Sequence, residues 1–369
     1  MFEPVFTVSI NEITLYYQIT MRKSYSIPSV FEHNNSNLAM VSQDLINGLR
    51  IYIDDIPYIV GNLALSEGQA PHRTVNAAPS EVDYKILFEA ALLLAAYKNN
   101  RPMFVTTGFP FSTFQVNKHM ASDLLQKTHT IAFDMSSFTG KGRTEMKVDV
   151  VTVELLPEMM GNIVALRQGE TKASGNFFVI SLGYGTCEAV LSTENGIVQR
   201  TAISINGLQY AIDLFIKELG LQYNLGLKNE KQIEQAFMNN FIMLDRKKID
   251  ILDIRRKVLN MYYRDVISPN LRRIFTDADF TKSSKMFITG GGALYMELVE
   301  NFYKEFEGIL NIEVVENPLT LTSVGYCLHS AQVNGGDINT AVGIDIGNSN
   351  TVVTQYEDVN IESGDLRFK

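Results

Sequence analysis

Three glycine-containing turns, each directly after an apolar β-rich run, constrain the fold of this chain more than any other feature. They occur within Phe177–Ser192, Met286–Phe302 and Gly343–Val353. After the first and last turns a second β-rich run follows, whereas an amphipathic helical pattern follows the middle turn. Such segments place backbone amides without bulky side chains at the ends of strands. The sequence therefore predicts an α/β fold with several turns suited to binding anionic oxygens.

The remaining patterns agree with an α/β fold. Ile86–Tyr97 is apolar enough to predict a buried helix, and 333–337 (VNGGD) predicts a flexible connector before the last strand pair. Residues 208–275 combine many charges with apolar residues at three- and four-residue spacing, which predicts a mostly helical insertion. Within that insertion, helical patterns cover 228–237 and 245–265. Short β-rich runs stand at 6–10, 13–18, 50–55 and 103–108.

Composition excludes several function classes. The 369 residues, 46% of them hydrophobic, are enough for two domains. The 32 basic and 41 acidic residues give a net charge of −9, so the surface as a whole repels nucleic acid, and we expect any DNA to be reached through a partner protein. The only two cysteines, Cys187 and Cys327, and the absence of a secretory pattern at the N-terminus predict a reduced, cytoplasmic protein. The longest apolar run contains Glu89 and is too short to span a bilayer, so we expect no membrane association. The five histidines lack metal-site spacing, so we expect no zinc.

The C-terminal turn carries the most chemistry. Asp345 ends an apolar strand, where its carboxylate can hold the waters of a hydrated Mg²⁺. Gly347, which has no Cβ, permits a positive φ and the close approach of anionic oxygens. Asn348, Ser349 and Asn350 add side-chain donors. The alternative for this segment alone is an ordinary β-hairpin.

The other two turns repeat this plan. In the first, Gly183, Gly185 and Thr186 shape the reversal between two strands. In the other, Gly290–Gly292 stand between a buried strand and a helix, where bare backbone can pack against a flat ring or a phosphate. Each turn taken singly is also explained by geometry alone, but three in one chain favour a nucleotide site.

These segments resemble a known superfamily. DIGNSNTVV, SLGYGTCEAVL and ITGGGA are similar to the phosphate-one, phosphate-two and adenosine motifs of the actin, sugar kinase and heat-shock chaperone ATPases. Residues 153–166 and 319–331 resemble the two connecting helices of that superfamily. IPSVFEH and VTTGFPFS resemble strands of the ParM-type plasmid-segregating actins and of archaeal actin-like proteins. The order of the motifs matches the superfamily, except that phosphate-one stands last.

The resemblance implies two domains that close on ATP or ADP with Mg²⁺ between them. Glu158, in PEMMG, matches the residue that orients the attacking water, and Asp345 the metal site. The alternative for Glu158 is a solvated glutamate at a helix start. In phosphate-two, Ser181 stands where the superfamily usually has an aspartate, and Tyr184 stands where it usually has a small residue. These departures predict either slow hydrolysis or a Mg²⁺ held mainly by Asp345. Glu188 lies too far along the hairpin to be assigned the missing role. The residues implied in nucleotide binding are Asp345, Gly347, Asn348, Ser349, Asn350, Ser181, Gly183, Tyr184, Gly185, Thr186, Gly290, Gly291, Gly292 and Ala293.

The displaced motif suggests a circular permutation. Residues 5–18 occupy the place where phosphate-one normally stands and align weakly with Ala341–Tyr356, but they lack its aspartate and glycine. We expect the C-terminal hairpin to fold back into the first domain, and the alternative is insertion into a neighbouring subunit. The predicted domains are 1–160 plus 323–369, and 161–322 with the helical insertion at about 208–275.

The resemblance implies a polymerising ATPase whose cytomotive filaments, built of the chain itself, separate plasmid or phage DNA through a DNA-binding adaptor. GTP is a possible substrate beside ATP. Two alternatives stay open: a weakly hydrolysing nucleotide-binding adaptor, which Ser181 favours, and a small-molecule kinase, for which we find no sugar-binding carboxylate motif.

Overall fold

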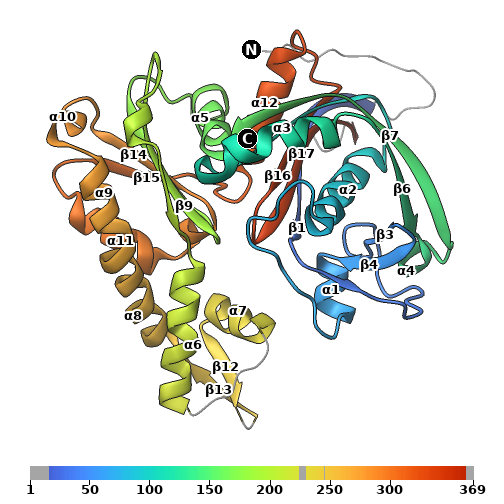
Figure 1. The fold of residues 1–369 in the computed structure, drawn as a ribbon, viewed down its shortest axis with the longest axis horizontal. Helices are drawn as coiled ribbons and strands as arrows, with labels where there is room; N and C mark the ends of the chain where they lie inside the picture. Colours follow the sequence, from blue (N-terminus) through green and yellow to red (C-terminus); the bar gives the residue numbers. More distant parts are fainter. Residues whose placement is uncertain (1–15, 224–229, 245, 363–369) are drawn as a thin grey trace.

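The chain folds around two β-sheets that stand side by side, each with its own helices (Figure 1). The computed structural model describes residues 16–223, 230–244 and 246–362. The predicted α/β class is confirmed by this arrangement. The predicted N-terminal hairpin at 5–18 lies almost entirely outside the described residues.

The first sheet has nine strands in the order β1-β17-β16-β5-β7-β6-β3-β4-β2. Its strands are β1 (Tyr16–Pro28), β2 (Phe31–His33), β3 (Arg50–Ile53), β4 (Ile56–Val60), β5 (Met103–Phe109), β6 (Thr128–Asp134), β7 (Arg143–Pro157), β16 (Ala341–Ile346) and β17 (Asn350–Glu362). The associated helices are α1 (Asn62–Glu67), α2 (Val82–Ala96), α3 (Phe111–Leu125) and α4 (Ser136–Thr139). Helix α2 contains the predicted apolar run, and it is buried from Ile86 through Ala96 against this sheet.

The C-terminal hairpin lies inside this first sheet. Strand β16 runs parallel to β5 on one side and antiparallel to β17 on the other. Strand β17 in turn pairs with β1 over thirteen antiparallel positions, from Asn350 opposite Pro28 to Glu362 opposite Tyr16. Strands β16, β17 and β1 therefore form a meander in which the end of β17 lies beside the start of β1.

The second sheet carries the other two turns. Its strands are β8 (Phe177–Leu182), β9 (Thr186–Thr193), β10 (Gly196–Ile197), β11 (Ile203–Asn206), β14 (Lys285–Thr289) and β15 (Asn311–Val314). Alternating apolar residues of β8, β9 and β14 pack with the helices α6 (Gln209–Tyr223), α8 (Leu252–Tyr262), α9 (Ser268–Ile274) and α11 (Met296–Glu305) in a separate core. The three-residue helix Gln199–Thr201 follows β10.

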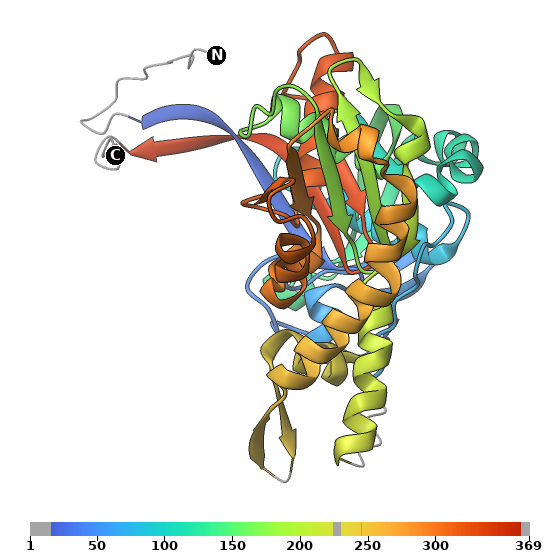
Figure 2. The same cartoon turned by 90° about the vertical axis from the view of Figure 1, so that its left-hand side faces the viewer.

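The helical insertion contains one element that the sequence patterns did not predict. Helix α7 (Glu230–Asn239) overlaps the predicted 228–237 pattern. It is followed by a hairpin of β12 (Phe241–Leu244) and β13 (Lys247–Asp250), and β13 occupies the start of the 245–265 segment that was expected to be helical. Helix α8 begins only at Leu252, where the carboxylate of Asp250 accepts a hydrogen bond from the Leu252 amide and stops the helix from extending backwards. Figure 2 shows this hairpin at the far end of the insertion.

Two helices connect the sheets. Helix α5 (Glu158–Gln168) leads from the first sheet to the second, and α12 (Leu321–Val333) leads back. They cross at two glycines, since a Cβ built on Gly325 would lie 1.7 Å from the carbonyl oxygen of Gly161. The helices can approach this closely only because neither residue has a side chain.

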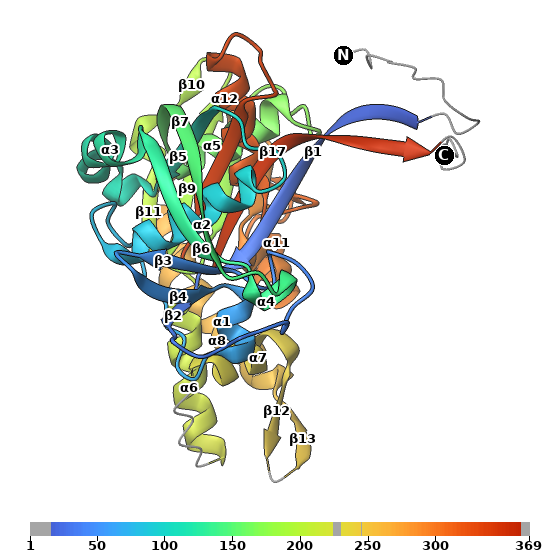
Figure 3. The same ribbon diagram turned by 90° about the vertical axis from the view of Figure 1, so that its right-hand side faces the viewer.

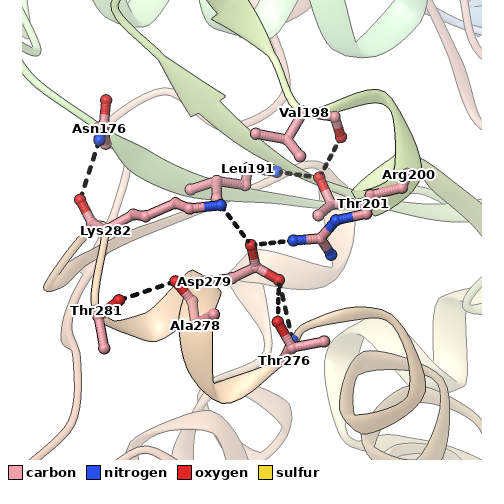
Figure 4. Close-up of polar contacts among 10 residues, drawn as sticks. All are labelled: Asn176, Leu191, Val198, Arg200, Thr201, Thr276, Ala278, Asp279, Thr281 and Lys282. Atoms are coloured by element: carbon pink, nitrogen blue, oxygen red, sulfur yellow. Dashed lines mark hydrogen bonds and ion pairs between the residues drawn. The ribbon is translucent and has the colours of Figure 1, made fainter.

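A buried carboxylate ties one edge of the second sheet together (Figure 4). Asp279, in α10 (Asp277–Phe280), is fully buried and accepts hydrogen bonds from Arg200 and Lys282 and from the backbone and hydroxyl of Thr276. Burial alone would raise the pKa of this carboxyl, but the hydrogen bonds from Arg200, Thr276 and Lys282 outweigh it and hold the pKa well below its usual value. The contact joins the end of the β9–β10 hairpin to the segment before β14.

No helix in the described part of the chain is long and apolar enough to cross a membrane.

Candidate nucleotide-binding site

A cleft between the two sheets is lined by all three glycine-containing turns. Of the residues implied in catalysis and nucleotide binding, two do not line it: Gly185 lies directly behind the lining, and Ala293 is buried in the core of the second sheet. The others meet in this one cleft: Glu158, Ser181, Gly183, Tyr184, Thr186, Gly290, Gly291, Gly292, Asp345, Gly347, Asn348, Ser349 and Asn350.

The C-terminal turn is held by the residue that follows β1. The Gly347 amide donates to the carbonyl oxygen of Asn350 at 3.0 Å and closes the turn. Ser29 donates its amide to the carbonyl of Ser349 at 2.9 Å and its hydroxyl to the carbonyl of Gly347 at 2.6 Å. Gly347 does not take the positive φ that the sequence suggested. It is needed for space, because a Cβ there would lie 2.9 Å from the Asn350 carbonyl oxygen.

The turn after β8 has the same construction. A Cβ on Gly183 would lie 2.6 Å from the carbonyl oxygen of Thr186, the equivalent of the Gly347–Asn350 contact. Three amides at and just before the start of α6, those of Gly207, Leu208 and Gln209, donate to the carbonyls of Gly185, Gly183 and Tyr184. The carbonyls of this turn are thereby fixed toward α6.

Each of the two turns contains backbone amides that donate no hydrogen bond to any described residue. These are the amides of Asn348 and Ser349 in one turn and of Tyr184 and Gly185 in the other. Buried or half-buried amides are almost always paired with protein, water or ligand. Three of these residues, Tyr184, Asn348 and Ser349, line the cleft, and amides placed there are suited to a chain of anionic oxygens.

The two turns touch each other across the cleft. A Cβ on Gly185 would lie 2.2 Å from Nδ2 of Asn348. The same Asn348 side chain exchanges two hydrogen bonds with Asn76, accepting from its amide at 2.5 Å and donating to its side-chain oxygen at 2.9 Å. Asn76 therefore uses both polar groups of the Asn348 side chain, which does not donate to a ligand in this conformation. The expected donor to a ligand is instead the backbone amide of Asn348.

Three carboxylates stand close enough at the floor of the cleft to repel one another. Burial raises the pKa of Glu158 to about 7. Burial and then the charge of Glu158 raise the pKa of Asp345 well above its usual value. The pKa of Glu188 is raised by the same two causes in the same order. A site that concentrates negative charge in this way favours a bound cation.

Several buried polar atoms beneath Asp345 have no partner among the described residues. They are the hydroxyls of Tyr84, Thr107 and Tyr326 and the Oε2 atom of Glu188. The other oxygen of Glu188 accepts a 2.6 Å hydrogen bond from the amide of Phe111, at the start of α3. Unpaired buried groups next to a cleft are explained by ordered water or by a hydrated ion.

The described residues include no group of three or more acidic, histidine or cysteine residues that could hold a metal ion by themselves. A hard cation held by one protein carboxylate, waters and phosphate oxygens is the usual arrangement for Mg²⁺ at nucleotide sites. Asp345, the unpaired hydroxyls and the free amides fit that arrangement.

The third turn and the insertion form an apolar slot beside the acidic floor. Gly290 has φ +82°, and a Cβ there would clash with the backbone of Leu182 at 2.8 Å, so this turn packs on the end of β8. The slot itself is lined by Phe237, Met238, Leu294, Tyr295 and Leu319. Its flat, apolar walls suit an aromatic ring.

Buried Arg255 positions one wall of this slot. Its guanidinium donates to the carbonyls of Phe237 and Met238 at the end of α7 and forms an ion pair with buried Glu297 in α11. It also lies 5.1 Å from the centre of the Tyr295 ring. A single side chain therefore fixes α7, α8 and α11 relative to one another.

An ion pair bridges the mouth of the cleft. Arg73, from the segment between α1 and α2, pairs with Glu234 of α7 and lies 4.7 Å over the ring of Tyr184. Both pair members are mostly buried. The pair joins the segment beside the first sheet to the insertion of the second.

Sequence reasoning missed Ser29, Asn76, Arg73 and Tyr84. Ser29 lies within IPSVFEH, but its partners and those of Asn76 are hundreds of positions away in the chain. In the structure Asn76 has a positive φ, a conformation that Asn tolerates well. Nothing in the local pattern marked Arg73 or Tyr84.

Comparison with known proteins agrees with this geometry. Residues 15–161 match the family described as the N-terminal domain of actin-like proteins. Among solved structures, an archaeal actin homologue is 16% identical, with a TM-score of 0.65 over 84% of this chain and 92% of its own. A 15-stranded ParM filament from Clostridium botulinum is 18% identical, with a TM-score of 0.67 over 83% and 92%. A Bacillus thuringiensis ParM with ATP is 16% identical, with a TM-score of 0.55 over 88% and 97%.

No curated protein sequence matches the chain. The structural matches establish the fold, which is the actin-like α/β fold of two domains around a cleft, as predicted.

Proposed function

We propose that this protein binds Mg²⁺ and ATP in the cleft and hydrolyses the nucleotide slowly. The observation that carries the proposal is the pair of turns that meet at the cleft, each with at least one lining residue whose backbone amide has no acceptor in the described chain, beside a cluster of carboxylates that repel one another. The amides match the phosphate oxygens, and the carboxylates match a divalent cation. Two solved structures of this fold support the choice of ligand, since their descriptions name ADP and ATP.

Asp345 is the residue we assign to the cation. It is the acidic residue at the tip of the C-terminal hairpin, and Ser181, at the corresponding position of the other hairpin, has no charge. Mg²⁺ would neutralise the phosphates and relieve the repulsion that raises the Asp345 pKa. Ser181 contributes only a hydroxyl to the waters around the ion.

Glu158 is the residue we assign to the attacking water. It is the first residue of α5 and lines the cleft, and the residue as a whole is half-buried. Because its pKa is raised to about 7, its carboxylate can take up a proton near neutral pH. Hydrolysis needs little more than a positioned water and neutralised charge. Buried Glu188, bonded to the Phe111 amide, acts on this group only through its charge.

We assign the apolar slot to the purine ring. Gly290–Gly292 have no side chains, so the ring can approach the backbone closely there. The slot does not by its lining select adenine over guanine, so GTP remains a candidate substrate beside ATP.

We further propose that the chain is a circular permutation of the actin-like fold, with domain I formed by 1–160 and 323–369 and domain II by 161–322. Support comes from the meander of β16, β17 and β1, in which Glu362 pairs with Tyr16. Joining those two ends would produce an uninterrupted phosphate-one hairpin followed by its third strand.

The biological role we propose is that of a cytoplasmic filament of many copies of this chain. Such a filament would move plasmid or phage DNA through a DNA-binding adaptor, because the acidic surface disfavours direct contact with DNA. The similar ParM filament structure supports assembly. A second candidate is a nucleotide-binding adaptor that scarcely hydrolyses, which the uncharged Ser181 favours.

One experiment separates these functions. The purified chain is mixed with Mg²⁺ and ATP, ADP or no nucleotide, then sedimented, imaged by electron microscopy and assayed for phosphate release. Filaments with slow phosphate release are expected with ATP. Nucleotide binding without filaments or phosphate release would establish the adaptor instead, and no binding at all would refute both.

A further inference from the structure

We propose that the paired outer parts of β1 and β17 form an arm that joins one copy of this chain to the next, edge to edge. We define the arm as Tyr16–Lys23 paired with Gln355–Glu362. This inference extends the proposed assembly by naming the surface through which copies meet. Figures 2 and 3 show the two strands leaving the body together and projecting well beyond it.

The arm has two open edges. Strand β1 is the last strand of the first sheet, and β17 is its partner. Strand β16 pairs with β17 only as far as Gln355. The carbonyl of the next residue, Tyr356, accepts a hydrogen bond from Arg101, and beyond it β17 pairs with β1 alone. A two-stranded ribbon is marginally stable in water on its own, and long uncovered edges are normally blocked or paired. Among the described residues, no further strand pairs with either edge.

The charges of the two strands identify the partner of each edge. Among the residues whose side chains are described, β1 contains Arg22 and Lys23 and no acidic residue, whereas β17 contains Glu357 and Asp358 and no basic one. Pairing two β1 edges would bring like charges together, and so would pairing two β17 edges. Pairing the β1 edge of one copy with the β17 edge of the next matches opposite charges. That arrangement is head-to-tail and can continue indefinitely.

Within one copy, only some of the charged side chains on β1 and β17 form ion pairs. Lys23 lies 3.6 Å from Glu357, and Arg22 pairs with Glu170, which is 79% exposed. Asp358 is exposed and accepts a hydrogen bond from the hydroxyl of Thr20, but no cation among the described residues neutralises it. Asp358 is therefore available to a neighbouring copy.

The other end of both strands lies at the cleft. Asn350, the first residue of β17, lines the cleft, and Pro28 opposite it precedes Ser29, which holds the C-terminal turn. A thirteen-residue strand is about 40 Å long, so the same strand starts beside the phosphate turn and ends in the arm. One strand therefore connects the C-terminal turn directly to the proposed assembly surface.

Charge reversal in the full-length chain tests the arm. Arg22→Glu and Asp358→Lys are each expected to raise the concentration at which ATP-dependent assembly begins by about five- to tenfold, the effect of turning one cross-strand attraction into repulsion. An equimolar mixture of the two variants should restore the wild-type threshold, because each reversed edge then meets an oppositely charged neighbour. Glu145→Lys, an exposed reversal on β7, is the matched control and should change nothing. Calorimetry with a non-hydrolysable ATP analogue checks that the cleft still binds.

A second measurement does not depend on the variants folding well. Wild-type protein labelled with ¹⁵N is mixed with unlabelled protein, assembled and treated with a carbodiimide, which joins lysine amines to nearby carboxylates. Cross-links from Lys23 to Asp358 between labelled and unlabelled chains would support the arm. Cross-links confined to single chains would overturn it.

The outcomes distinguish the arm from the proposed function. If wild type assembles and both reversals assemble at the same threshold as Glu145→Lys, the arm is wrong while filament formation stands. If wild type binds ATP but stays monomeric at every concentration, both the arm and the filament are refuted. Cross-linked copies in a protein that does not bind nucleotide would support the arm and refute the nucleotide site.

Discussion

Gly185 and Asn348 bring the two glycine-containing turns into contact, since a Cβ on Gly185 would lie 2.2 Å from the Asn348 side-chain nitrogen. They belong to different sheets and are separated by most of the second half of the chain. Their contact therefore defines how closely the cleft is closed in this structure.

Gly185→Ala is expected to weaken nucleotide binding by about five- to a hundredfold, because overpacking a tight contact typically costs about 1–3 kcal/mol. The added methyl has to displace Asn348, which is also held by Asn76. Calorimetry with a non-hydrolysable ATP analogue measures the effect. Gly142→Ala is the matched control, because nothing lies within 4 Å of a Cβ at that position. Equal affinities for the two variants would show that the turns do not have to touch in the bound state.

Glu158→Gln is expected to slow phosphate release by about two to four orders of magnitude, the usual loss when a positioned base is removed. Assembly with ATP should persist, because the cleft keeps its shape. Wild-type hydrolysis should rise with pH as the carboxyl passes through its pKa of about 7 and fall below it, since only the carboxylate can accept a proton. In Glu158→Gln this pH dependence should disappear. Hydrolysis that is unchanged in rate and pH profile would assign the water to another residue.

Much of this site could be predicted from sequence because its residues sit in short local patterns. The positions of Gly183, Gly290 and Gly347 follow directly from strand–turn signals, and so does buried helix α2. The role of Ser29 could not be predicted, because it depends on a strand pairing between the two ends of the chain. The β12–β13 hairpin was missed for a related reason. Its charged residues have helical spacing, whereas its pairing depends on Phe241–Leu244 meeting the strand after the turn.

Asp279→Asn is expected to reduce the free energy of unfolding by about 2–3 kcal/mol, through loss of a helix cap and of charged hydrogen bonds. The folded-state pKa of Asp279 lies below its unfolded value, so the ionised group stabilises the protein above about pH 4 and the contribution is lost as the pH falls through the folded pKa. Urea unfolding of both proteins between about pH 1 and 7 measures this. The gap between the two curves should be constant above about pH 5 and narrow steadily below about pH 4. A gap that does not narrow in acid would mean that the charge of Asp279 is not what stabilises the fold.

A permuted gene tests the topology. Moving 337–369 ahead of Met1 places the new ends at the exposed Gly335–Gly336 turn and joins β17 to β1 through residues 363–369 and 1–15. This variant should fold and keep its nucleotide affinity within about threefold, since joining neighbouring ends leaves the core intact.

Deleting 341–369 is the opposite test, because it removes β16 and β17 from the middle of the sheet and leaves β5 as an open edge. The deleted chain should aggregate and bind no nucleotide. A soluble deletion variant with native affinity would show that the C-terminal hairpin is dispensable.

The central claim is that the C-terminal hairpin holds the cation of a nucleotide site. Asp345→Ala removes its carboxylate while leaving the paired strands β16 and β17 in place. Calorimetric titration of wild type and Asp345→Ala with Mg²⁺ and a non-hydrolysable ATP analogue measures the claim directly. We expect binding to wild type and no measurable Mg²⁺-dependent binding to the variant. Equal affinity in both proteins would contradict the account.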